Sequence, residues 1–60
     1  MTQDEIRQEA NYHLHLSFWW HDKYQQNEGK LSDTLLGYFW QHAEEHSQLA
    51  VHFYSKLNAN

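Results

Sequence analysis

Hydrophobic positions recur at helical spacing in two long segments of this chain, separated by one short break. From residue 36 to residue 57, apolar residues and one histidine alternate at intervals of three and four, as in a helix packed along another helix. Between residues 6 and 24, the apolar positions cover an arc of roughly 260° when each residue turns by about 100°. No proline and no interior glycine interrupts this first segment. The pattern therefore predicts an all-α protein built from two long helices.

Local capping signals set the ends of the predicted helices. Thr2 is followed three residues later by Glu5, which is the spacing of a capping box, and Gly29 is suited to end the first helix in a left-handed conformation. Ser32 is a favourable N-cap for the second helix. We therefore expect one helical-hairpin domain over residues 1–60, with a helix over about 3–27, a turn over about 28–31 and a helix over about 32–57. Such a short turn makes the two helices antiparallel neighbours.

The apolar surface of these helices exceeds what one hairpin can bury. The heptad-like seam of the second helix identifies the residues expected to hold the hairpin together or to form the dimer core: Leu36, Phe39, Ala43, His46, Ala50 and Phe53. Further apolar residues widen the arc of this helix to about 220°, and soluble monomers rarely expose contiguous apolar patches beyond a few hundred Å². The chain has no cysteine, so disulfides cannot stabilise it. We therefore expect a homodimer in which two hairpins form a four-helix bundle.

Length and charge argue against several classes of function. Four Lys and Arg against eight Asp and Glu give a net charge of −4, whereas nucleic-acid binding relies on clustered basic residues. No apolar stretch approaches the ~18 residues of a membrane span, and Asp4 and Glu5 do not fit a signal peptide. A chain of 60 residues is also too small for an enzyme with its own dry cleft. We expect a cytoplasmic, non-enzymatic protein without a cofactor.

Aromatic residues are concentrated near the turn end of the predicted hairpin. Residues whose numbers add to about 59 lie at one level across the turn, so 18–20 lie level with 38–40, and all six are aromatic. Either these rings form core and dimer contacts, or some remain exposed and anchor another protein, because Trp and Tyr are frequent interface hot spots. The candidates for partner binding are Trp19, Trp20, Tyr38 and Trp40.

The six histidines offer a second candidate chemistry. His42 and His46 are four residues apart on one helix face, and His13 lies level with His46 across the hairpin. The three imidazoles could converge on a metal ion. We favour the interpretation that a histidine in the seam hydrogen-bonds one ring nitrogen to a neighbouring hydroxyl or carbonyl group and fixes the register, so we assign no metal and keep the three-histidine site as an alternative. Neutral histidines buried in the bundle would also make it open or reorganise below about pH 6.

The architecture resembles the small hairpin accessory proteins of plasmids and phages, such as Rop-like regulators and early-region proteins of lambda-like phages. The capped first helix, the Gly29 turn and the second heptad helix carry this resemblance, and residues 42–46 with Leu49 and Phe53 are similar to the second helix of Rop. The resemblance implies a dimeric, non-catalytic regulator from a mobile element. Rop-like RNA binding requires a basic outward face on the first helix, and here that helix offers only Arg7 and Lys23.

Together, these observations favour an oligomeric interaction or regulatory module that binds a host protein. The first alternative is a histidine-based metal-binding helical module, which would show metal-dependent folding. The second is a Rop-like nucleic-acid regulator, which would show salt-dependent binding to RNA or DNA.

Overall fold

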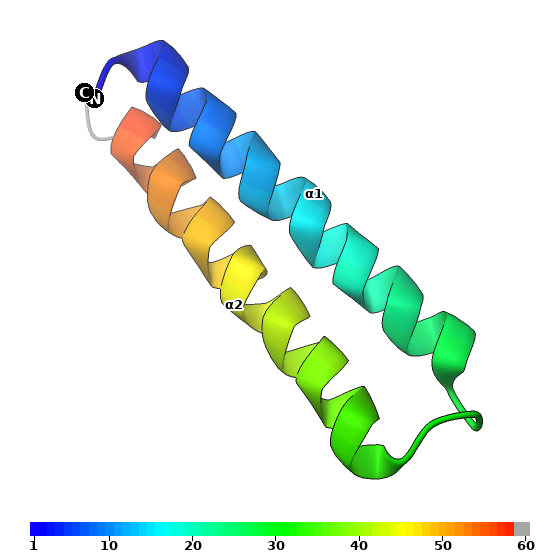
Figure 1. Ribbon diagram of the computed structural model, residues 1–60. Helices are drawn as coiled ribbons and strands as arrows, with labels where there is room; N and C mark the ends of the chain where they lie inside the picture. Colours follow the sequence, from blue (N-terminus) through cyan, green and yellow to red (C-terminus); the bar gives the residue numbers. More distant parts are fainter. Residues whose placement is uncertain (59–60) are drawn as a thin grey trace.

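Two antiparallel helices make up the computed structural model, which describes residues 1–58 and the side chains of residues 1–57. Helix α1 spans Gln3–Asn27 and helix α2 spans Asp33–Asn58. The helices pack side by side along their length, and the start of α1 lies beside the end of α2 (Figure 1). The hairpin is elongated, with extents of 45 × 14 × 13 Å. The predicted all-α hairpin is therefore confirmed.

Capping hydrogen bonds define the helix ends as the sequence predicts. The Thr2 backbone N–H donates to Glu5 Oε1 at 3.3 Å, and the Glu5 N–H donates to Thr2 Oγ1 at 3.1 Å, which completes a capping box. Gly29 has φ of 81°, a left-handed conformation that favours glycine. At the start of α2, the Leu35 N–H donates to Ser32 Oγ at 3.3 Å. Each of these bonds satisfies a backbone donor that the first turn of a helix leaves unpaired.

The seam between the helices alternates small and large residues. The register is fixed by His13 against His46, whose ring centroids are 5.1 Å apart, and by Trp20 against Phe39, at 5.6 Å. Between and beside these large pairs lie small buried residues, which allow the backbones to approach closely: Ala10 and Ser17 on α1, and Ala43 and Ala50 on α2. The hairpin is therefore held together over a narrow strip.

This strip buries few large hydrophobic side chains. The buried hydrophobic residues are Ile6, Ala10, Leu36, Ala43 and Ala50, and among the described residues no large side chain is fully buried. Of the residues expected in the core, Leu36, Ala43 and Ala50 are buried, whereas Phe39, His46 and Phe53 are half-buried. In the described part of the chain, neither helix is apolar over a stretch long enough to cross a membrane.

Candidate functional site

The seam divides the surface of the hairpin into two long faces. Leu16 and Leu49 each directly precede a small seam residue, and because the helices are antiparallel they fall on the same face. His21 and Trp40 each directly follow a large seam residue and fall on the other face. Their rings meet edge to face across the hairpin, with centroids 5.0 Å apart, in agreement with this assignment.

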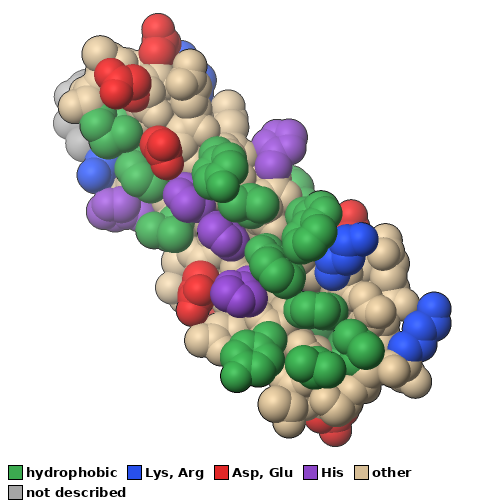
Figure 2. Space-filling model, in the orientation of Figure 1, with side chains coloured by type: hydrophobic (Ala, Val, Ile, Leu, Met, Phe, Trp, Pro, Cys, Tyr) green, Lys and Arg blue, Asp and Glu red, His purple; other side chains and the backbone are tan. Residues whose placement is uncertain are grey.

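One of these faces carries most of the exposed large hydrophobic side chains, and we call it the apolar face. Its central residues are Tyr12, Leu16 and Trp19 from α1 and Leu35, Tyr38 and Leu49 from α2. Leu16 is half-buried, and the other five are between 40% and 59% exposed. Figure 2 shows hydrophobic side chains of both helices gathered along the middle of one side of the hairpin, with histidines between them and most charged side chains at the rim and ends. An apolar centre within a charged rim is the usual anatomy of a protein interface.

The opposite face also exposes large side chains, but contacts between the helices partly close it. The Tyr54 hydroxyl donates to Asn11 Oδ1 at 2.5 Å. Besides His21, the Trp40 ring contacts Tyr24, with centroids 5.5 Å apart. Phe18 and Val51 stay 58% and 66% exposed on this face. The opposite face therefore offers a smaller and more interrupted apolar surface.

The four aromatic residues predicted to bind a partner lie near one level but not on one surface. Trp19 and Tyr38 lie on the apolar face, and Trp40 lies on the opposite face, 46% exposed. Trp20 lies in the seam, where its ring stacks on His42 at 4.6 Å. Consecutive residues on a helix point about 100° apart, so a run of aromatic residues cannot share a face. Two of the four rings are therefore exposed on the apolar face, one is exposed on the opposite face and one is half-buried in the seam.

A hydrogen-bonded pair of histidines occupies the middle of the seam. His13 Nδ1 and His46 Nδ1 are 2.9 Å apart, and the two rings are 21° from parallel. The ring centroids are 5.1 Å apart, which is longer than the nitrogen–nitrogen distance by about one ring radius on each side. The two Nδ1 atoms therefore lie between the ring centres, and each points at the other. One nitrogen must therefore donate and the other accept. The predicted position of His13 level with His46 is confirmed.

Neighbouring groups indicate which histidine donates. Glu9 Oε2 lies 3.6 Å from His13 Nε2, which favours a proton on that nitrogen. His13 Nδ1 then accepts, and His46 Nδ1 donates. On its other side, His13 stacks on Phe53, with centroids 5.8 Å apart and ring planes 3° from parallel.

The environment of His46 favours its neutral form. Burial lowers the pKa of His46, and the nearby His13 and His42 lower this pKa further, while Glu45 raises it in part. A proton added to His46 enters Nε2, because Nδ1 already carries the proton that it donates, so the hydrogen bond to His13 is kept. Burial of His46 and its two histidine neighbours, and not the geometry of this hydrogen bond, therefore favour the uncharged form of His46 in the folded protein.

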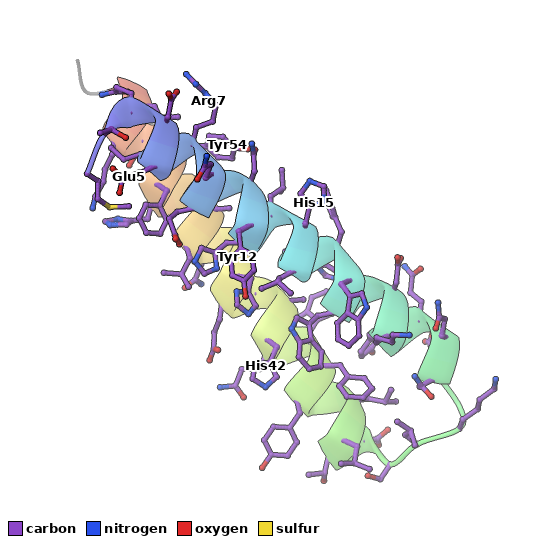
Figure 3. All side chains as sticks on the ribbon, turned by 45° about the horizontal axis from the view of Figure 1, so that its top comes forward. Glu5, Arg7, Tyr12, His15, His42 and Tyr54 are labelled. Carbon is purple, nitrogen blue, oxygen red and sulfur yellow. The ribbon has the colours of Figure 1, made fainter. Side chains whose placement is uncertain are left out.

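His42 does not join the pair. Its ring lies on Trp20, and its Nδ1 is 3.8 Å from Glu45 Oε2. Figure 3 shows His42 of α2 and Tyr12 of α1 on the same side of the hairpin, whereas His15 points away from α2. Within residues 1–57, no group of three or more His, Asp or Glu side chains is placed to hold a metal ion. The three histidines of the alternative metal site therefore do not form a metal-ligand group in the described part of the chain.

The basic side chains are dispersed over the hairpin. Arg7 pairs with Asp4 at 3.2 Å, in an exposed contact one turn apart on α1. Lys23 Nζ lies 5.2 Å from the centre of the Trp19 ring. Such scattered cations do not make the continuous basic groove that binds a phosphate backbone.

Family models, curated proteins and solved structures give no match to this chain.

Proposed function

We propose that this chain is a non-enzymatic interaction module whose working unit is a homodimeric four-helix bundle. One observation carries the proposal: within residues 1–57, the hairpin buries little beyond three alanines, Ile6 and Leu36, while nine large hydrophobic side chains remain 40% to 70% exposed. Most of the hydrophobic area of such side chains would stabilise the fold only if another surface covered it.

The dimensions of the hairpin fit this proposal. A long face measures about 45 × 14 Å. A standard protein interface buries roughly 800 Å² on each partner, and one such face is about large enough to supply this area. Stacking two hairpins face to face gives the four-helix arrangement in which each helix has two neighbours.

Sedimentation velocity over a range of concentrations tests the dimer. We expect a species of twice the chain mass of 7.3 kDa at about 100 µM, with dissociation on dilution. The Leu49→Glu variant should shift the balance to monomer, because it places a charge in the apolar face. Val51→Glu, at an exposed position on the opposite face, is the matched control. A helical monomer of 7.3 kDa at all concentrations would contradict the proposal.

We further propose that the module regulates a host protein in the cytoplasm, as an accessory protein of a phage or plasmid. The support is the second group of exposed side chains, around Trp40 and Phe18 on the opposite face. Tryptophan is the residue most enriched among binding hot spots.

The Trp40→Ala variant tests this second step. We expect it to lower the recovery of a protein partner from a host lysate by about tenfold or more while leaving the helicity and the dimer intact. Gln48→Ala, at an exposed position of α2, should leave recovery unchanged. Loss of helicity in Trp40→Ala would instead assign this ring to the stability of the hairpin.

A further inference from the structure

We infer that the apolar face seats a second copy of this chain across a two-fold axis that runs perpendicular to the helices and passes near Leu16 and His42. This inference rests on the proposed self-association and adds the face, the symmetry and the residue pairs. In this arrangement, the turns of the two copies lie at opposite ends of the bundle.

Two symmetric ways of stacking two hairpins on this face need to be compared. A two-fold axis across the helices places α1 on α1 of the second copy and α2 on α2, with each pair antiparallel. A two-fold axis along the helices places α1 on α2 of the second copy, and both turns then lie at the same end. The residues at the edges of the face distinguish the two arrangements.

On α1, the first arrangement pairs opposite charges. Glu9 and Lys23 lie seven residues before and seven residues after Leu16, on the same stripe of the helix. With an axis near Leu16, Glu9 of one copy therefore faces Lys23 of the other, twice in the dimer. Leu16 meets Leu16, and Tyr12 meets Trp19 of the second copy.

On α2, the same arrangement pairs leucines. Leu35 and Leu49 lie seven residues before and seven residues after His42, so Leu35 faces Leu49 of the second copy. Residues of the two helices lie level when their numbers have the same sum as the contacting pair His13 and His46. The numbers of Leu16 and His42 give this sum to within one, so these two residues lie at nearly the same height along the hairpin. One axis therefore satisfies both helices.

The second arrangement sets charges against leucines. With α1 on α2 of the second copy and the same heights, Glu9 faces Leu49 and Lys23 faces Leu35. Covering a charged group with an apolar side chain is costly unless the charge finds a partner. The Lys23 ammonium lies over the Trp19 ring, 5.2 Å from its centre, and is therefore at the edge of the apolar face. The charge pattern therefore selects the arrangement with the turns at opposite ends.

Charge exchange tests the residue pairs. Glu9→Lys and Lys23→Glu should each raise the dimer dissociation constant about tenfold, because each places like charges opposite one another twice. The double variant Glu9→Lys with Lys23→Glu should return the constant to within about threefold of the wild-type value. This recovery separates the pairing from the contact of Glu9 with His13, which the double variant does not restore. Glu44→Lys, on the opposite face, is the control and should change the constant by less than about twofold. A double variant as weak as the single variants would overturn the inference.

A distance measurement tests the direction of the turns. The chain has no cysteine, so Lys30→Cys provides a single site for a nitroxide label in the turn. Electron–electron double resonance on the labelled dimer should give a distance of about 45 Å, the length of the hairpin. A distance below about 20 Å is expected if both turns lie side by side at one end of the bundle. This result would contradict the arrangement with the turns at opposite ends, although the dimer itself would still be supported. A labelled sample that sediments as a monomer would instead overturn the proposed function, and this inference with it.

Discussion

At the scale of single residues, the pair of His13 and His46 is the most specific feature of the seam. A hydrophobic pair at this layer would fill the same space without a directional bond. The hydrogen bond between the two Nδ1 atoms, 2.9 Å apart, instead fixes the register of this layer, and the burial that lowers the pKa of His46 makes the layer sensitive to pH. The groups that face this histidine are His13 from α1 and His42 and Glu45 from α2.

The stability of the fold should consequently fall in mild acid. Because the pKa of His46 is lower in the folded protein than its ordinary value of 6.5, the unfolded chain binds more protons as the pH falls below about 6.5. The free energy of unfolding is therefore highest above this pH and decreases as the pH falls through the pKa of folded His46. Urea unfolding followed by circular dichroism, at fixed protein concentration between about pH 7 and pH 5, measures the slope. His46→Leu should flatten it, whereas the exposed-site control His15→Gln should not. An equal slope in His46→Leu would contradict this role.

At the scale of the helices and the turn, replacing each of the two glycines by alanine should change the free energy of unfolding in opposite directions. Gly29 has φ of 81°, so Gly29→Ala should lower the free energy of unfolding by about 1 kcal/mol. Gly37 lies within α2, and a Cβ added there meets nothing within 4 Å. Gly37→Ala should therefore raise the free energy of unfolding by about 1 kcal/mol. Chemical denaturation of both variants checks the pair, and the same sign of change in both would contradict the assigned turn.

The helices were predictable from sequence because their signals are local. The capping box at Thr2, the left-handed Gly29 and the three-and-four spacing along α2 each involve neighbouring positions. The sum of residue numbers across the turn also predicted the level of His13 and His46. The division of the aromatic residues was missed, because it depends on which positions flank the seam after both helices have packed. The heptad stripes through Ala10 and Ser17 and through Ala43 and Ala50 are the signal that could have revealed it.

At the scale of the whole molecule, a single hairpin leaves most of its large hydrophobic side chains outside its core. Its buried strip is alanine-rich, and its larger side chains line the surface on either side of that strip. The apolar face has an apolar centre and a charged rim (Figure 2), which is the distribution expected of half a four-helix bundle. Folding and self-association should accordingly be one coupled process.

The dependence of thermal unfolding on protein concentration tests this coupling most directly. If the folded state is a dimer, raising the concentration about a hundredfold should raise the Tm by about 10 °C, because mass action stabilises the assembled form. Circular dichroism melts from about 1 µM to about 100 µM measure this shift. A Tm that rises with concentration is the result we predict, and a cooperative melt whose Tm is the same at every concentration would contradict the account.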